Sequence, residues 1–267
     1  MRILLPPSET KRSGGGKSVL TLTEFAEPEL NPARDAVLTQ LAALASKPRS
    51  AAKILKLSAK QLDYLEDDMH LRDSPTMPAV ERYTGVLYDA LDAPSLGSSQ
   101  REWLNRHVQI QSSLFGRVSA TDLIPTYRLS ASTALPGLKI ARKPCSLKNF
   151  WQSAHREATR ATARKHFVLD LRSKDYVALD PTAGTSGEVN WINIVARSED
   201  GVVRALNHFN KAAKGRLVRR LAESQPEIES RLDFLDWASA SGIEFEAESN
   251  GSILVVADSV KLEAGSL

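Results

Sequence analysis

The sequence predicts one α/β domain in which a mixed central sheet is surrounded by helices. Two observations lead to this prediction. Segments with helical spacing and segments with strand spacing are interleaved along the chain, without the strict alternation of repeated strand-helix-strand units. The chain has 267 residues, of which 42% are hydrophobic, and it contains no linker-like stretch. It is therefore long enough to bury a sizeable core, and we expect residues 1–267 to fold as a single domain.

In the first part of the chain, helices are expected more often than strands. An apolar run at 2–5 ends at two prolines, which predicts a short buried strand. Asn31 can cap a helix and Pro32 suits its first position, which predicts a helix over 31–45. Apolar spacing predicts further helices at 58–70, 79–91 and 98–105, and strands at 108–114 and 124–129.

The later part of the chain alternates helices with strand pairs. A long helix is expected at 147–165 and a strand at 167–171. Residues 189–196 and 202–206 are expected to form a hairpin that turns at 198–201. Two helices follow, at 210–223 and 226–239. A second hairpin is expected to pair 243–246 with 253–257 around Asn250-Gly251, a dipeptide typical of two-residue turns.

Several classes of protein do not fit the sequence. Pro6 stops the first apolar run after three residues, and no run approaches the roughly 20 residues that span a bilayer. Cys145 is the only cysteine, so neither an internal disulfide nor a thiolate zinc cluster is expected. The five histidines form no metal-binding pattern. We therefore expect a soluble, cytoplasmic and monomeric protein without a metal or cofactor and without a membrane partner.

The formal net charge of +3 conceals an uneven distribution of charge. Residues 139–175 carry ten basic and three acidic side chains, a balance of +7, and residues 201–220 carry six basic side chains and no acid. The C-terminal segment 221–267 carries ten acids and two basic side chains, a balance of −8. A basic centre of this kind indicates a polyanionic partner. The alternative is that the basic side chains are solvated on helix surfaces or pair with the acidic segment.

Polar, basic and aromatic side chains gather after several predicted strands and on the basic helix. Arginine and lysine can bind phosphate, whereas tyrosine and phenylalanine can stack on a base. The candidate nucleic-acid or phosphate-binding residues are Ser8, Thr10, Lys11, Phe115, Tyr127, Arg128, Arg172, Ser173, Lys211, Lys214 and Arg216.

Two hypotheses about function follow from these residues. In the first, lysine and arginine neutralise the phosphates of DNA, and binding falls steeply with salt. In the second, the chain is an enzyme that acts on a nucleotide, a nucleobase or a related small anion. Its candidate catalytic residues are Glu9, Lys11 and Asp170, of which either carboxylate is a general base if burial raises its pKa. A deep pocket favours the enzyme, and an open groove favours DNA binding.

Seven short motifs resemble the YaaA family of peroxide-stress-resistance proteins, in the order in which that family carries them. They are LLPPSETK (4–11), PAVERYTGVLYDAL (78–91), SLFG (113–116), IPTYRL (124–129), NFW (149–151), LDLRS (169–173, with Tyr176) and HFNKAAKGR (208–216).

The resemblance implies a cytosolic protein of the hydrogen peroxide response that limits iron-driven damage and binds double-stranded DNA. It also implies one compact domain of unusual topology with a positively charged cleft. A helix-hairpin-helix element is expected at about 58–83.

Overall fold

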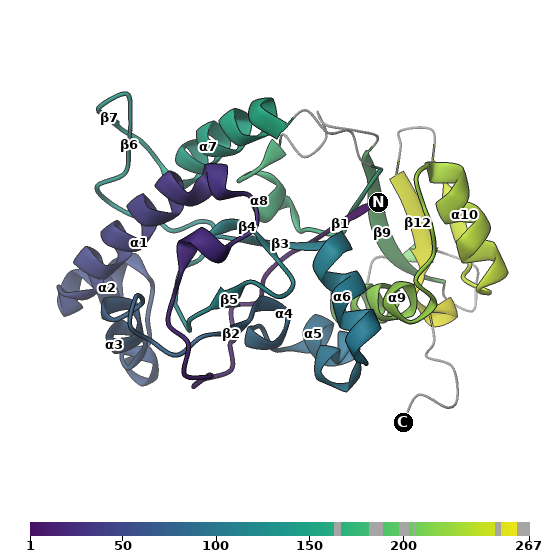
Figure 1. Ribbon diagram of the computed structural model, residues 1–267, viewed down its shortest axis with the longest axis horizontal. Coiled ribbons are helices and arrows are strands. Elements are labelled where there is room, and N and C mark those ends of the chain that lie inside the picture. Colours follow the sequence, from purple (N-terminus) through teal and green to yellow (C-terminus); the bar gives the residue numbers. More distant parts are fainter. Residues whose placement is uncertain (163–166, 182–188, 198–202, 205–206, 249–251, 261–267) are drawn as a thin grey trace.

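Figure 1 shows the computed structural model, which describes residues 1–162, 167–181, 189–197, 203–204, 207–248 and 252–260. Within these residues, the strands pair into one large mixed sheet and two small ones. The large sheet has the order β11-β12-β9-β8-β1-β3-β4, with β10 paired to β9. Helices lie around this sheet, so the predicted mixed α/β class is confirmed.

The strands of the large sheet come from both ends and the middle of the chain. They are β1 (Arg2–Leu5), β3 (Val108–Ser112), β4 (Gly116–Ser119), β8 (Val168–Asp170), β9 (Val189–Arg197), β10 (Val203–Arg204), β11 (Phe245–Ala247) and β12 (Ser252–Val256). Strand β1 runs parallel to both of its neighbours, β3 and β8. Strands β8, β9 and β12 also run parallel to one another, whereas β4, β10 and β11 pair antiparallel. The small sheets pair β2 (Met77–Pro78) with β5 (Leu123–Ile124) and β6 (Lys139–Ile140) with β7 (Lys143–Pro144).

Strand β1 lies in the middle of the core. The side chains of Ile3, Leu4 and Leu5 are completely buried. A strand that has a parallel partner on each side is covered on both faces, which explains why these three positions are all apolar.

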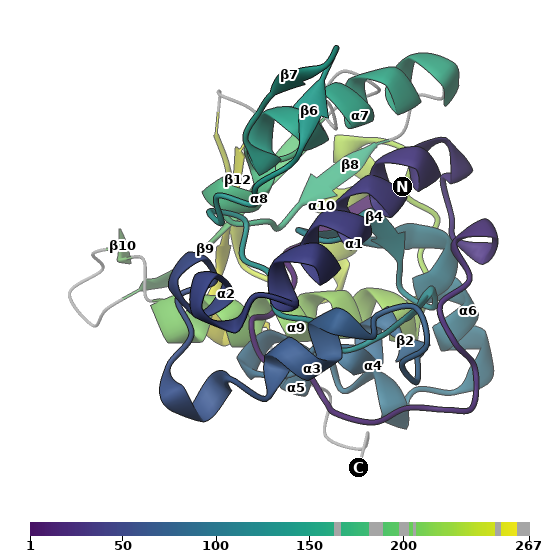
Figure 2. The same ribbon diagram turned by 90° about the vertical axis from the view of Figure 1, so that its left-hand side faces the viewer.

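Helices cover both faces of the sheet. Figures 1 and 2 show α1 (Asn31–Ala45) and α7 (Leu147–Thr162) together on one side, and α5 (Val86–Leu91), α6 (Ser98–His107) and α9 (Asn207–Ser224) together on the other. Helix α10 (Arg231–Ala240) lies beside β12, where Arg231 donates a hydrogen bond to the carbonyl of Ser252 (3.3 Å).

Short helices connect these parts of the fold. The α-helices among them are α2 (Pro48–Ile54), α3 (Tyr64–Met69), α4 (Ala79–Arg82) and α8 (Lys174–Val177). The 3₁₀ helices are η1 (Leu22–Glu24), η2 (Pro28–Leu30), η3 (Ala59–Gln61), η4 (Ala93–Ser95) and η6 (Ala257–Ser259).

Most predicted elements are confirmed with small changes of boundary. The strand at 2–5 and the helix at 31–45 are found as expected, and both predicted hairpins pair antiparallel, as β9 with β10 and β11 with β12. The predicted turns at 198–201 and Asn250-Gly251, and the end of the predicted helix at 163–165, lie outside the described residues.

Three predicted elements differ from the structure. The helix expected at 79–91 is divided into α4 and α5, because Tyr83 is extended and Gly85 has a φ of +96°. The helix expected at 58–70 is divided into η3 and α3, and the strand expected at 124–129 is reduced to β5. Strand β4 was not predicted, because its sequence GRVS lacks an apolar pattern and buries Arg117.

Within the described segments, we find no helix that combines the length and the apolar character needed to cross a membrane.

Candidate functional site

The best candidate site lies at the edge of the sheet where β1, β3 and β8 end. Because these three strands are parallel, the chain leaves all of them on the same edge. After β1 the chain continues towards β3, and after β8 it continues towards β9 on the opposite side. In open α/β sheets, ligands bind at such a change of direction, outside the carboxyl ends of the strands. Residues 6–11, 113–115 and 171–173 meet at this edge.

Lys11 is the centre of this site. Its Nζ lies 4.1 Å from the centroid of the Tyr127 ring and 5.4 Å from that of Tyr83. The same nitrogen donates hydrogen bonds to the backbone carbonyl oxygens of Ser8 (3.1 Å) and Glu9 (3.4 Å). The Lys11 amine therefore packs between aromatic rings and carbonyl oxygens. Within the described residues it forms no ion pair.

A chain of hydroxyl groups runs beside Lys11. The Tyr127 hydroxyl lies 2.8 Å from the Ser112 Oγ and 2.8 Å from the Tyr83 hydroxyl. The Ser112 Oγ already accepts the backbone N–H groups of Leu114 and Phe115, which occupy both of its lone pairs. Ser112 must therefore donate its proton to Tyr127, whose hydroxyl shares a further hydrogen bond with that of Tyr83. The two tyrosines are thus fixed by the end of β3.

Asp68, from α3, is a buried carboxyl group on the other side of this site. Its Oδ1 accepts the backbone N–H of Arg128 (2.8 Å), whereas its Oδ2 is buried without a hydrogen-bond partner among the described residues. The Arg128 side chain turns outwards and pairs with the carboxylate of Glu9 (3.0 Å). The site therefore holds one buried carboxyl group, with the arginine-glutamate pair nearer to its surface.

The pKa values of Lys11 and Asp68 shift towards each other. Burial of the ammonium and, to a smaller extent, the charge of Arg128 lower the pKa of Lys11 to about 7, although Asp68 acts in the opposite direction. Burial raises the pKa of Asp68 to about 8, against the N–H of Arg128 and the charge of Lys11. Near neutral pH, the site thus offers a partly neutral amine and a protonated carboxyl group. Groups shifted in this way are suited to acid-base and nucleophilic chemistry.

The chain after β8 reaches the same site. Ser173 is exposed and precedes α8, whose Tyr176 is partly buried. Burial raises the pKa of Tyr176, and Tyr127 and Glu9 act on this pKa in the same direction. Two exposed or half-buried hydroxyls, Ser8 Oγ and Thr10 Oγ1, lie 3.1 Å apart beside them.

Asp170 and Arg172 do not face this site as free groups. Arg172 is buried and forms an ion pair with Asp170, with an Nη2 to Oδ2 distance of 2.6 Å. Its Nε also donates to Asp170, whereas its Nη1 lies 3.6 Å from Asp180 and donates to Gln111 (3.3 Å), and Asp180 also pairs with Arg117 (2.8 Å). This network satisfies charges inside the core, so its immediate role is structural.

The basic helix α9 uses most of its candidate residues for packing. Lys214 is half-buried and donates to the carbonyl of Leu171 (2.8 Å), and burial lowers its pKa to about 8 although Asp170 raises it. Arg216 donates to the carbonyl of Val260 (2.6 Å). Of the three basic candidates on this helix, Lys211 is the exposed one.

Phe115 is completely buried, with its ring centroid 5.5 Å from that of Phe25 and 5.8 Å from that of Tyr127. Its ring supports Tyr127 from inside the core.

The most exposed basic surface lies on α2 and the turn that follows it. Residues 47–60, called here the basic run, carry five exposed basic side chains and no acid. They are Lys47, Arg49, Lys53, Lys56 and Lys60. Lys56 has a φ of +55° in the turn between α2 and η3, and Ser58 and Gln61 form a capping box at the start of η3. The basic run thus presents two short helices joined by a tight, lysine-bearing turn.

A second exposed basic segment lies at the same end of the molecule. The β6–β7 hairpin and the start of α7 carry Lys139, Arg142, Lys143 and Lys148, without an acid between them. Figure 1 shows this hairpin and α2 at the left end of the molecule.

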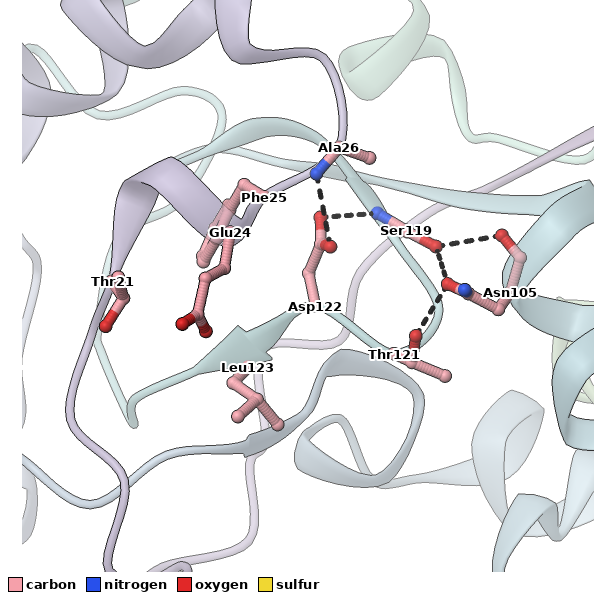
Figure 3. Close-up of a pocket in the computed structure, with 9 residues that line it drawn as sticks. All are labelled: Thr21, Glu24, Phe25, Ala26, Asn105, Ser119, Thr121, Asp122 and Leu123. Carbon is pink, nitrogen blue, oxygen red and sulfur yellow. Dashed lines mark hydrogen bonds between the residues drawn. The ribbon is translucent and has the colours of Figure 1, made fainter.

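A cavity of about 370 Å³ lies at the opposite edge of the sheet, near the start of β3 (Figure 3). Asp122 projects between η1 and β4, where it accepts the backbone N–H groups of Ala26 (3.3 Å) and Ser119 (2.8 Å). Asn105 accepts the hydroxyls of Ser119 and Thr121. None of the candidate residues named from the sequence lines this cavity.

No group of three or more metal-ligating side chains occurs in the part of the chain that the structure describes.

The sequence alone did not indicate Asp68, Tyr83 or Ser112 as site residues. Tyr83 lies within the motif at 78–91, and this motif was the signal in the sequence that could have identified it as a site residue. Asp68 follows two other acids, a pattern typical of a solvated helix face, and only the tertiary structure buries it.

The fold and the site define a mixed α/β protein with a half-buried lysine and a buried carboxyl group at the carboxyl edge of its parallel strands. The chain belongs to the family described as Peroxide stress protein YaaA, which it matches over residues 1–249.

Relatives with similar sequences are named UPF0246 proteins. One from Corynebacterium glutamicum is 40% identical over 250 residues, which cover 94% of this chain and 96% of the relative. One from Streptomyces coelicolor is 35% identical over 251 residues, or 93% of each chain. One from Neisseria meningitidis serogroup B is 26% identical over 245 residues, which cover 87% and 91%. The family membership supports a role in peroxide stress.

Proposed function

We propose that this protein acts in the response to hydrogen peroxide by binding double-stranded DNA, and that it thereby limits the damage that iron and peroxide cause. The observation that carries the proposal is the basic run 47–60. It has five exposed basic side chains and no acid, on two short helices joined by a tight turn. Such a surface neutralises phosphates without reading the sequence of bases.

The β6–β7 hairpin adds a second acid-free basic segment at the same end of the molecule. By contrast, Arg172, Lys214 and Arg216 are engaged in hydrogen bonds inside the protein. The proposed DNA contact therefore lies on the basic run and the hairpin, with Lys211 as the exposed side chain on α9.

Salt dependence provides the test of this contact. The double variant Lys53→Gln and Lys60→Gln removes two exposed charges without removing any hydrogen bond of the described structure. Each lost phosphate contact should reduce the slope of log K against log salt by about 0.9, so the double variant should reduce it by about 1.8. Fluorescence titration of a labelled duplex over a range of salt concentrations measures this slope.

The matched control is Lys17→Gln with Arg106→Gln, two exposed charges that lie outside both basic segments. The control should bind duplex DNA with the wild-type slope. Equal slopes for the two double variants would show that the basic run does not contact DNA.

A second candidate function is an enzyme that acts on a nucleotide, a nucleobase or a related small anion. The observation that favours it is that one site holds the half-buried Lys11 and the buried Asp68, with pKa values of about 7 and 8. Calorimetric titration with nucleoside monophosphates and free bases tests this candidate, and binding that survives Lys11→Met would place the ligand elsewhere.

A further inference from the structure

The Lys11 amine has the surroundings of a nucleophile. A lysine attacks carbonyl groups when its amine is neutral, which proteins achieve by removing water from it or by placing a second cation beside it. The surroundings of Lys11 act in this direction, since the half-buried residue packs its Nζ on the rings of Tyr83 and Tyr127, and the charge of Arg128 lowers its pKa. Glu9, two residues before Lys11, forms its ion pair with Arg128 and not with the Lys11 amine.

The same site holds a group that can exchange protons with a reacting carbonyl. Asp68 is buried, and its Oδ2 has no hydrogen-bond partner among the described residues. Asp68 is linked to Lys11 through consecutive residues, because its Oδ1 accepts the backbone N–H of Arg128 (2.8 Å) and the Lys11 Nζ lies 4.1 Å from the ring centroid of Tyr127. A protonated carboxyl group beside an amine can supply the proton that a departing hydroxyl needs.

The proposed DNA contact and this amine belong to adjoining parts of the fold. The basic run ends at Lys60 in η3, and α3 begins four residues later at Tyr64 and carries Asp68. A duplex bound to the basic run therefore lies next to the segment that forms one wall of the Lys11 site.

We propose that Lys11 Nζ forms an imine with an aldehyde, and that this aldehyde is the ring-opened sugar of a base-free position in duplex DNA. The inference rests on the proposed DNA binding for the source of the aldehyde. A neutral amine reacts with carbonyl compounds. The sugars of duplex DNA offer such a carbonyl group where a base has been lost, because the ring-opened sugar then carries an aldehyde at C1′.

The reaction balances without an oxidant or a reductant. The Nζ lone pair attacks C1′, and the resulting carbinolamine loses its hydroxyl as water, with one proton taken from the nitrogen and one supplied by an acid such as Asp68. The C1′=N bond that remains makes the C2′ proton acidic. Removal of that proton to a base breaks the bond between C3′ and its phosphate oxygen, and water later hydrolyses the imine to free Lys11.

Reductive trapping tests the proposal. The full-length protein is incubated with a duplex that contains one base-free position and with sodium cyanoborohydride, which converts an imine into a stable amine. We expect a covalent protein–DNA adduct that forms only with the reductant and maps to Lys11 by mass spectrometry. The variant Lys11→Arg keeps the positive charge and should bind the duplex but form at least ten-fold less adduct, whereas Lys17→Arg should behave as wild type.

A free aldehyde separates this inference from the proposed function. In a parallel reaction, 2-deoxyribose 5-phosphate replaces the duplex, and labelling of Lys11 is compared with that of Lys17. Preferential labelling of Lys11 supports imine formation even if the protein does not bind DNA. Duplex binding without an adduct at Lys11, or an adduct that persists in Lys11→Arg, would refute imine formation while leaving DNA binding intact.

Discussion

Gly215 allows a direct test of how α5 and α9 pack. A Cβ atom at this position would lie 2.1 Å from the carbonyl oxygen of Leu87, 3.0 Å from Leu91 N and 3.0 Å from the Ala90 Cβ. The nearest of these atoms belongs to the backbone of α5 and cannot rotate away. The Gly215→Ala variant should therefore force the two helices apart.

The magnitude follows from two opposing effects. Overpacking of a tight contact costs about 3 kcal/mol at the upper end of its usual range. Replacing glycine by alanine inside a helix returns about 1 kcal/mol. The net loss in the free energy of unfolding is then about 2 kcal/mol, which for a chain of this size lowers Tm by about 4–8 °C.

Urea denaturation and thermal unfolding followed by circular dichroism measure this loss. The matched control is Gly16→Ala, whose Cβ would have the carbonyl oxygen of Thr76 as its nearest neighbour, 3.7 Å away. The control should change stability by less than about 0.5 kcal/mol. A Gly215→Ala variant as stable as wild type would refute the close approach of α5 and α9.

Two further predictions concern buried charges. The variant Arg172→Ala leaves the buried Asp170 without its main partner. The free energy of unfolding, measured in urea at pH 7, should therefore fall by about 3–5 kcal/mol. A loss below about 1 kcal/mol would contradict the role of this pair in the core. The pKa of Lys11 is lowered from 10.5 to about 7 in the folded protein. Between pH 7 and pH 10.5 the unfolded chain therefore binds more protons than the folded one, and Lys11 makes the free energy of unfolding rise with pH. Lys11→Met should lose that rise when urea midpoints are compared at pH 7.5 and 9.5, and an unchanged pH dependence would show that the amine is ordinarily charged.

The sequence predicted part of the candidate site because parallel strands place their following loops at one edge. Lys11 and Tyr127, 116 positions apart, meet at 4.1 Å, and Glu9 pairs with Arg128. These side chains could be named because each follows an apolar run or stands in a recognised motif. Asp68 could not, since its burial depends on a hydrogen bond from the backbone of Arg128.

The residues interpreted as phosphate contacts also depend on tertiary contacts that the sequence does not show. In the sequence, Gly215 between Lys214 and Arg216 resembles a place where backbone approaches phosphate. In the structure, it is the place where α9 approaches α5. Local pattern predicts helices and strands well, but it does not distinguish a close contact with a ligand from a close contact within the fold.

The position of β1 has a consequence for how the protein is made. Strand β1 leaves the ribosome before either of its partners in the sheet, β3 and β8, and β8 is synthesised more than 160 residues later. The ribosome adds about 5–20 residues each second, so β1 waits many seconds for its second partner. During that time its apolar edge is open to other chains.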